Sequence, residues 1–193
     1  SYRLAEKKIR LKGCESMSLL IPNKLIPDLL KLLKQFSGDI VFEFNKNTLL
    51  IKNDNQVVHI RLIDGIFPNY RQIIPTSNTT TITTLKHDVQ NLIRTLSLFT
   101  DRYNQVTLIM VPDEKGCKIN TENGGVGASH QFLEASIIGE PLTLSINVKY
   151  LSEVIPYLLK ESMVFECTTP QRPIVVKSTS DGSFTYLIMP LSR

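Results

Sequence analysis

The sequence predicts an α+β protein with antiparallel sheets and with helices on one face of those sheets. A unit of about 60 residues recurs three times along the chain, each time in the order β-α-β-β-β. Alternating apolar residues mark its strands, apolar residues three and four positions apart mark its helix, and turn-forming Asn, Asp and Gly separate the strands. These observations together set the predicted fold class.

The first unit begins with a predicted strand over residues 17–21 and a helix that follows Pro22 and Asn23. The helix is indicated by apolar residues at helical spacing, which are Leu25, Ile26, Leu29, Leu30 and Leu33. Gly38 ends this helix. Three strands are predicted after it, over residues 40–44, 48–51 and 57–62.

The second and third units repeat this order. The second has a strand over residues 79–84, a helix carrying Val89, Leu92, Ile93 and Leu96, a strand over 106–111 and a turn over 112–116. The third has a strand over 142–146, a helix carrying Leu151, Val154, Ile155 and Leu158, and strands over 163–166, 174–177 and 184–189. Pro156 interrupts the last helix and predicts a kink or a short first segment.

A polar, turn-prone stretch over residues 75–78 predicts a domain boundary near residue 75. The second and third units have no such linker between them, so we expect them to pair their sheets in one domain over residues 76–193. Residues 1–75 are then the second half of a neighbouring domain. The start at Ser1, without an initiator Met, suggests a fragment.

Composition predicts an ordinary cytoplasmic protein, with 42% hydrophobic and 21% charged residues among 193. No apolar run approaches the roughly 20 residues of a membrane helix, and the N-terminus does not follow the plan of a signal peptide. Three widely spaced cysteines, Cys14, Cys117 and Cys167, indicate neither a disulfide framework nor a zinc site, and we expect them to be reduced and buried.

Motifs for catalysis are absent from the sequence. The three histidines, His59, His87 and His130, have no Cys or Ser motif nearby, and no Walker loop, Gly-x-Ser-x-Gly or His-Glu-x-x-His occurs. Residues 124–127 (GGVG) join two strands without a following helix, so they indicate a hairpin turn and not a phosphate loop. We therefore expect no catalytic residue, no metal and no cofactor.

Basic residues recur on each predicted helix, although the formal net charge is only +4. They are Lys24, Lys31 and Lys34 on the first, Lys86 and Arg94 on the second, and Lys149 and Lys160 on the third. Solvated helix faces carry lysines in most proteins, and Asp28 and Glu153 lie among these cations. Contact with DNA phosphates needs positive charge alone, so the pattern leaves both interpretations open.

Three segments resemble bacterial DNA sliding clamps. Residues 64–75 (DGIFPNYRQIIP) are similar to the Asp-Gly-x-Phe-Pro-Asp-Tyr-Arg segment between the middle and last domains of that family. Residues 186–191 (YLIMPL) are similar to its Tyr-x-x-Met-Pro ending, and residues 1–5 (SYRLA) to its Arg-Leu-Ala segment. The order of the three units agrees as well, so the resemblance covers the whole chain, from midway through the second clamp domain to the C-terminus.

The resemblance implies the sliding-clamp fold and a processivity factor, a head-to-tail homodimeric ring of six similar domains that encloses duplex DNA without reading its sequence. The helix cations would then face DNA, and Leu98 and Phe99 would lie at the apolar edge buried against a neighbouring subunit. Without the first domain and the front half of the second, the chain is not expected to close a ring.

The resemblance also implies a hydrophobic pocket in which the replicative polymerase, the clamp loader and repair proteins dock short peptides carrying a Gln and bulky apolar residues. By position in the matching motifs, the wall of this pocket is Tyr2, Arg3, Leu4, Pro68, Ile73, Leu187, Met189, Pro190 and Leu191. Gln72 stands at the polar rim where many relatives have Arg, and the ending at Ser192 and Arg193 also departs from the pattern. Strand alternation allows only one of Leu187 and Ile188 to face the pocket.

Two other classes of function are weighed against this one. A small α+β hydrolase or transferase needs a nucleophile with its base, and the sequence offers none. A sequence-specific DNA reader needs Arg, Asn and Gln massed on one helix face, and no predicted helix has them. A longer reading frame with three more such units upstream would distinguish the clamp from both.

Overall fold

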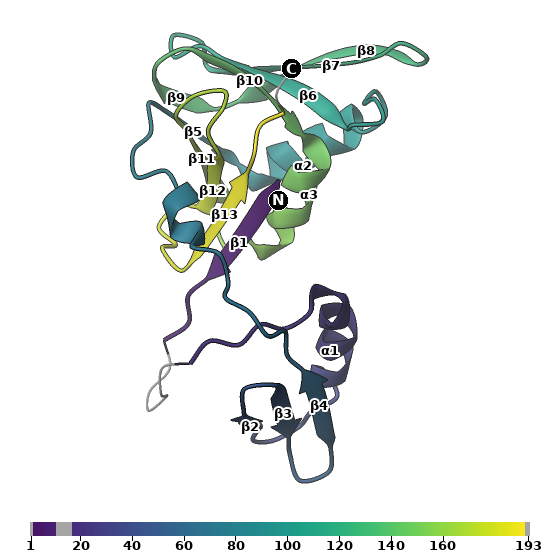
Figure 1. Cartoon of the computed structure of the whole chain (residues 1–193). Helices are drawn as coiled ribbons and strands as arrows, with labels where there is room; N and C mark the ends of the chain where they lie inside the picture. Colours follow the sequence, from purple (N-terminus) through teal and green to yellow (C-terminus); the bar gives the residue numbers. More distant parts are fainter. Residues whose placement is uncertain (1, 11–16, 192–193) are drawn as a thin grey trace. The chain divides into compact units, whose positions relative to one another are not determined.

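A computed structural model describes residues 2–10 and 17–191 of the chain, which divides into two compact units (Figure 1). The larger unit is made of Ser1–Arg10 and Tyr70–Arg193, and the smaller unit of Leu11–Asn69. Each unit has a hydrophobic core of its own.

One antiparallel sheet of the larger unit has six strands in the order β1-β13-β12-β11-β5-β9. These strands are β1 (Arg3–Lys7), β13 (Phe184–Ile188), β12 (Ile174–Ser178), β11 (Ser162–Cys167), β5 (Thr80–Leu85) and β9 (Ser136–Gly139). β5 of the second recurring unit pairs with β11 of the third, with Ile82 opposite Phe165. The second and third recurring units are therefore joined in one sheet of the larger unit. β1 joins the sheet through β13, with Leu4 opposite Leu187.

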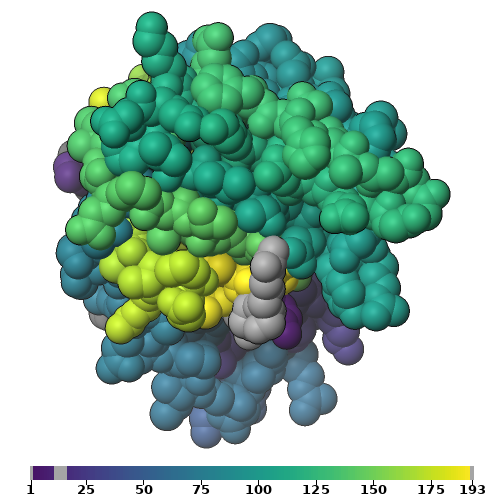
Figure 2. Space-filling view, turned by 90° about the horizontal axis from the view of Figure 1, so that it is seen from above, coloured from purple at the N-terminus to yellow at the C-terminus, as the bar shows by residue number. Residues whose placement is uncertain are grey.

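The second sheet of the larger unit has four strands in the order β10-β6-β7-β8. These strands are β10 (Leu142–Asn147), β6 (Gln105–Met110), β7 (Gly116–Asn123) and β8 (Gly127–Glu134). The β7–β8 hairpin extends beyond the rest of the sheet, on the right of both Figure 1 and Figure 2. Residues 124–126 form its turn, and Gly127, the first residue of β8, has φ +127°, a conformation that favours glycine, so the hairpin predicted at residues 124–127 is confirmed.

Two helices, α2 (Lys86–Leu96) and α3 (Val148–Val154), contact each other and share one core with the strands of both sheets. α2 buries the stripe predicted from its spacing, Val89, Leu92, Ile93 and Leu96. Complete burial of such an aliphatic side chain contributes about 1.5 to 3 kcal/mol to stability. In the part of the chain that the structure describes, no helix is long and apolar enough to cross a membrane.

Pro156 shortens the third helix as predicted. α3 ends at Val154, and the 3-10 helix η3 (Ile155–Tyr157) follows it. Proline has no N–H to donate to the carbonyl four residues earlier, so the α-helical hydrogen bonding stops there. Lys160, predicted on this helix, therefore lies in the loop between η3 and β11, which is a correction to its expected place.

The smaller unit contains the 3-10 helix η1 (Asn23–Leu25), α1 (Ile26–Leu33) and an antiparallel sheet of β2 (Val41–Phe44), β3 (Thr48–Lys52) and β4 (Val57–Arg61). Its core is small and centres on Leu29 of α1 and on Leu49 and Ile51 of β3. β2 buries none of its residues, and Phe42 and Phe44 stay 55% and 42% exposed.

The strand predicted over residues 17–21 is wrong, because residues 17–22 form no strand in the structure. The apolar residues Leu19 and Ile21 pack against the core instead. The carbonyl of Leu20 accepts one hydrogen bond, from the N–H of Ile63. One such bond does not make a ladder, so the alternation that predicted a strand reflects core packing here.

Candidate functional site

The ends of β1 and β13 build a small apolar hollow in the larger unit. It is lined by Tyr2, Arg3 and Leu4 from the first segment, Ile73 from the 3-10 helix η2 (Tyr70–Ile73), Pro173, and Leu187 and Met189 at the C-terminal end. The ladder extends one step beyond β13, because the N–H of Met189 donates to the carbonyl of Tyr2 at 2.8 Å. This bond fixes the backbone at the mouth of the hollow.

The floor of the hollow is buried and its rim is exposed. Leu187 on the floor is 2% exposed, whereas Tyr2 and Ile73 on the rim are 64% and 50% exposed. The space measures about 60 Å³, which is room for roughly four water molecules. An exposed apolar rim over a buried apolar floor can accept an apolar side chain from a partner.

A cation stands at the edge of this hollow. The Nε of Arg3 lies 3.2 Å from Oε2 of Glu153 on α3, and its guanidinium lies 4.6 Å from the ring centroid of Tyr150. Tyr186 donates its hydroxyl to the carbonyl of Tyr150 at 3.1 Å, and burial raises the pKa of Tyr186 to about 12. These contacts hold α3 against β1 and β13.

The structure brings together six of the ten residues predicted for the pocket, Tyr2, Arg3, Leu4, Ile73, Leu187 and Met189. Ile188, which alternates with Leu187, is completely buried in the core, so only one of the pair faces the hollow, as alternation requires. Pro68 belongs to the smaller unit.

The other predicted pocket residues do not line the hollow. Gln72 is exposed on η2, and Pro190 is buried. Leu191 donates its N–H to the carbonyl of Ser145 on β10, so the chain turns from the hollow toward the four-stranded sheet. Ser192 and Arg193 lie outside the described residues.

Pro173 lines the hollow but was not predicted as a pocket residue from the sequence. It directly precedes β12, whose Ile174 lies opposite Ile188 of β13. Pro173 belongs to none of the three motif segments, so only the pairing of β12 with β13 could have pointed to it. The strands over residues 174–177 and 184–189 were predicted. Their patterns do not show that the two strands pair, or in which register, so they could not place Pro173 beside the end of β13.

The predicted DNA-facing cations are mostly exposed, but they do not all lie on helices. Arg94 and Lys149 are exposed on α2 and α3. Lys86 begins α2, and its half-buried side chain donates from Nζ to the carbonyl of Leu158 at 3.2 Å. Lys31 of α1 lies 3.7 Å from Asp28. Lys24 lies in η1 and Lys34 caps the C-terminus of α1, and both are exposed.

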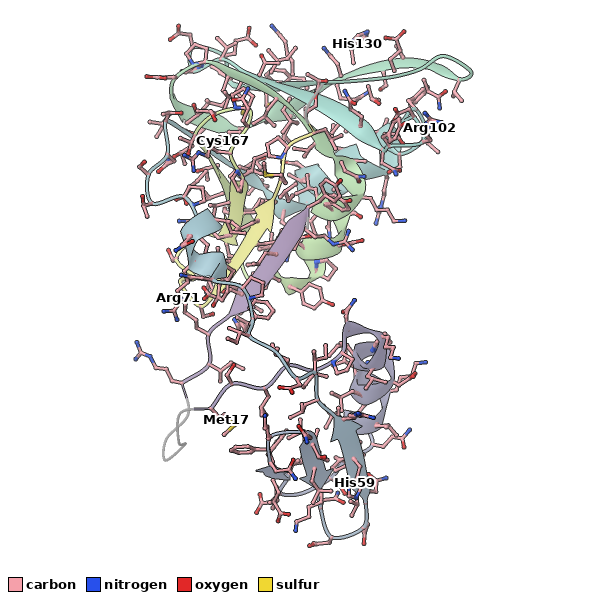
Figure 3. The ribbon with its side chains drawn as sticks, in the orientation of Figure 1. Met17, His59, Arg71, Arg102, His130 and Cys167 are labelled. Atoms are coloured by element: carbon pink, nitrogen blue, oxygen red, sulfur yellow. The ribbon has the colours of Figure 1, made fainter. Side chains whose placement is uncertain are left out.

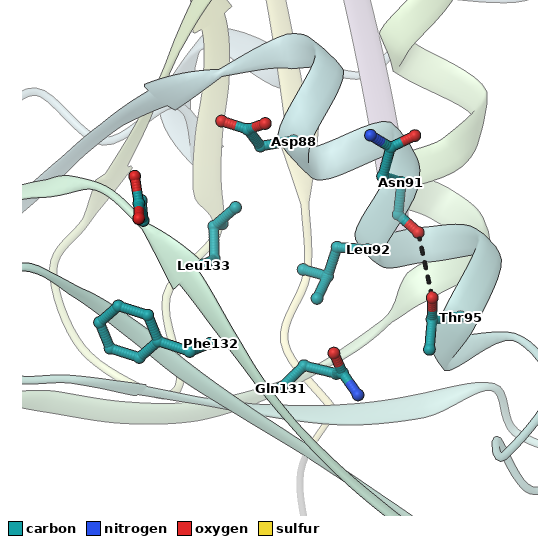
Figure 4. Close-up of a pocket in the computed structure, with 8 residues that line it drawn as sticks. Asp88, Asn91, Leu92, Thr95, Gln131, Phe132 and Leu133 are labelled. Carbon is teal, nitrogen blue, oxygen red and sulfur yellow. Dashed lines mark hydrogen bonds between the residues drawn. The ribbon is translucent and has the colours of Figure 1, made fainter.

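A second hollow lies between α2 and β8 (Figure 4). It is lined by Asp88, Asn91, Leu92 and Thr95 of α2 and by Gln131–Glu134 of β8. β8 pairs only with β7 among the described strands, so its other edge has no strand beside it. Leu98, in the turn after α2, is 70% exposed, and the neighbouring Phe99 is half-buried.

Histidines and cysteines form no site in the described part of the chain, where no group of three His, Cys, Asp or Glu could hold a metal ion. His130 lies on the four-stranded sheet, and Cys167 lies on β11 among the core strands (Figure 3). Cys117 and Cys167 are free and buried, and burial raises the pKa of each thiol to about 12. Cys14 lies outside the described residues.

Comparison with known families matches the chain along its length. The DNA polymerase III beta subunit central domain matches residues 1–69, and the C-terminal domain of the same subunit matches residues 71–192. These matches confirm the resemblance found in the three motif segments, and they do not favour a small enzyme or a sequence-specific DNA reader.

Relatives and solved structures agree with these matches. The chain is 24% identical to the beta sliding clamp of Vibrio cholerae, over 90% of this chain and 47% of the relative. A crystal structure of the Bacillus subtilis sliding clamp shares 26% identity at a TM-score of 0.92, covering all of this chain and 52% of the other. A Bartonella birtlesii sliding clamp bound to griselimycin shares 25% identity at a TM-score of 0.90, covering all of this chain and 52% of the other. The chain therefore spans about half the length of these relatives.

Proposed function

Because the chain belongs to the DNA polymerase III beta subunit family, we propose that it acts as part of a sliding clamp, a non-catalytic processivity factor of the cytoplasm. The complete homodimeric ring would encircle duplex DNA without reading its sequence. It would tether the replicative polymerase, the clamp loader and repair proteins through short peptides. The observation that carries this proposal is the apolar hollow at the ends of β1 and β13, which six residues of the three family-like segments line together with Pro173.

The proposed division into residues 1–75 of the middle clamp domain and 76–193 of the last domain is supported by the two family matches, which meet at residues 69 and 71. β1 comes from the first of these segments and pairs with β13 of the second. The pocket would accordingly take its walls from both sides of the division.

Peptide binding tests the proposed function directly. We define the test peptide as a fluorescently labelled segment that carries a Gln followed by Leu and Phe. Burial of the two apolar side chains contributes about 1.5 to 3 kcal/mol each, before the cost of ordering an extended peptide. We expect micromolar affinity in a polarisation titration, with displacement by griselimycin. Absence of binding by the folded chain at high micromolar concentration would contradict the proposal.

DNA binding by the chain is expected to be weak, salt-sensitive and independent of sequence, because an open surface with a few helix cations holds duplex only through phosphate charge. Replacing Lys24, Lys31, Lys86 and Lys149 with Ala should weaken it further and flatten its dependence on salt. Lys86 should contribute least, since its Nζ already donates to Leu158. Electrophoretic shifts at several salt concentrations measure both effects.

The matched control for DNA binding removes four lysines from other elements, Lys46, Lys52, Lys115 and Lys118. Both variants lose the same charge, so a difference between them reports position and not net charge. Equal loss in the two variants would contradict the DNA-facing assignment. Tight binding to one preferred sequence at physiological salt would contradict the clamp function itself.

Subunit contact in the complete ring is proposed at the free edge of β8 and the end of α2, with Leu98 and Phe99. An exposed strand edge with apolar side chains beside it is a surface suited to pairing with another chain. No described strand pairs with this edge, and we expect the 193-residue chain to be a monomer or to associate weakly. A stable, concentration-independent dimer of ring size in light scattering would contradict this expectation.

A further inference from the structure

Tyr70 connects η2 to β1 through a hydrogen bond in the larger unit. Its hydroxyl donates to Oε1 of Glu6 at 2.7 Å. The side chain of Glu6 is only 12% exposed, and Tyr70 is the half-buried residue of η2, whose other three residues are exposed. Tyr70 therefore links η2 to the edge strand β1 of the six-stranded sheet.

The geometry of the two elements relates this bond to the hollow. Tyr2, Leu4 and Glu6 alternate along an extended segment, so their side chains share one face. Tyr70 and Ile73 are three residues apart in a 3-10 helix, where side chains at that spacing are eclipsed. Because Tyr70 contacts Glu6, Ile73 on the same side of η2 lies at the hollow that Tyr2 and Leu4 line.

We propose that Glu6 and Tyr70 are positioning residues of the peptide pocket, which hold η2 against β1 and so keep Ile73 opposite Leu4. Neither residue lines the hollow, so each acts through the wall that it holds. The inference rests on the proposed function, because it concerns how the same pocket is kept open to a partner peptide.

Charge around Glu6 keeps its carboxylate ionised and able to accept this bond. Its Oε2 lies 3.2 Å from Nζ of Lys8, and Arg71 of η2, exposed at the surface in Figure 3, adds a second positive charge. The hydrogen bond from Tyr70, followed by Lys8 and Arg71, lowers the pKa of Glu6 below its ordinary value. The groups that face Glu6 are thus Tyr70 and Arg71 of η2 and Lys8 of its own segment.

A lowered pKa means that the charge-assisted contact is complete above the ordinary pKa of a glutamate and weakens to a neutral hydrogen bond as the pH falls through the lowered value. Peptide affinity should therefore stay constant from pH 8 to pH 5 and fall in stronger acid by no more than the about twofold expected for Glu6→Gln, because a protonated carboxyl and an amide each keep a neutral acceptor oxygen. The substitution Glu6→Gln keeps an acceptor oxygen at this place and leaves no charge to titrate. The peptide affinity of this variant should show no such acid decline.

The experiment measures affinity of the test peptide for the full chain and for five variants. Tyr70→Phe and Glu6→Ala should each weaken binding about fivefold, and the double variant should be no weaker than either single one, because both remove the same bond. Glu6→Gln should restore affinity to within about twofold of wild type. Tyr103→Phe is the matched control, since its hydroxyl accepts a bond from Arg102 and does not line the hollow.

The outcomes distinguish the proposed peptide-binding function from the positioning role of Glu6 and Tyr70. If wild type does not bind the peptide, the proposed function fails. If wild type binds and Tyr70→Phe or Glu6→Ala binds equally well, the positioning role is overturned while the pocket stands. Additive losses in the double variant would overturn it as well, as would a loss in Glu6→Gln equal to that in Glu6→Ala. Melting temperatures of all variants show whether any loss of binding comes from unfolding.

Discussion

Met189→Ala is expected to weaken binding of the test peptide about tenfold, which corresponds to about 1.4 kcal/mol. The half-buried Met189 side chain lines the hollow between Leu187 and the exposed rim. Alanine removes most of that apolar contact surface. The backbone bond from Met189 to Tyr2 does not depend on the side chain, so the ladder that shapes the hollow should persist. The same polarisation titration measures the change.

His87→Ala is the control for Met189→Ala. His87 lies on α2 with 72% of its side chain exposed, and it does not line the hollow. We expect its variant to bind the peptide as wild type does. The pocket assignment is wrong if both variants, correctly folded, bind with the same affinity.

A second large effect concerns stability. Gly139→Ala is expected to lower the free energy of unfolding by about 3 kcal/mol. Gly139 ends β9 at φ +116°, and a Cβ there would lie 1.8 Å from the carbonyl oxygen of Thr79. That oxygen accepts the N–H of Glu140, and Thr80 donates its hydroxyl to the Glu140 carbonyl at 2.7 Å. β9 cannot move away from β5 without loss of these bonds.

Chemical denaturation followed by circular dichroism measures this loss, with Gly182→Ala as the control. A Cβ at Gly182 would meet nothing within 4 Å. Its substitution should change the free energy of unfolding by less than about 1 kcal/mol. Equal destabilisation by the two substitutions would show that Gly139 is not required for the close approach of β9 to Thr79.

Local pattern was sufficient to predict most elements of the fold. The apolar spacing of Val89, Leu92, Ile93 and Leu96 predicted α2, because that stripe is the face that a helix must bury. Alternation predicted β6, where Val106, Leu108 and Met110 are buried. Pro156 predicted the end of α3 for a covalent reason that does not depend on packing.

Pairing between segments far apart in the sequence determined the strands that local pattern predicted wrongly or not at all. β9 was not predicted, because Ser136–Gly139 becomes a strand only through its pairing with β5. Residues 17–21 have the pattern of a strand and are not one, since they form no ladder with any described residue of the smaller unit. A strand is stabilised by hydrogen bonds to a neighbouring strand, and the sequence of one segment does not specify with which strand it pairs.

The candidate site was likewise predicted in part from the sequence and determined in part by the tertiary structure. The sequence by itself determined the motif segments that supply Tyr2, Leu4, Ile73, Leu187 and Met189, because their residue types and order identify the family. Only the tertiary structure decided that β1 pairs with β13, and that this pairing brings the two ends of the chain to one hollow. The same register places Pro173 there and turns Leu191 away toward Ser145. The physical reason is that a pocket between distant segments is set by hydrogen-bond register and packing, which are properties of the assembled sheet and not of any one segment.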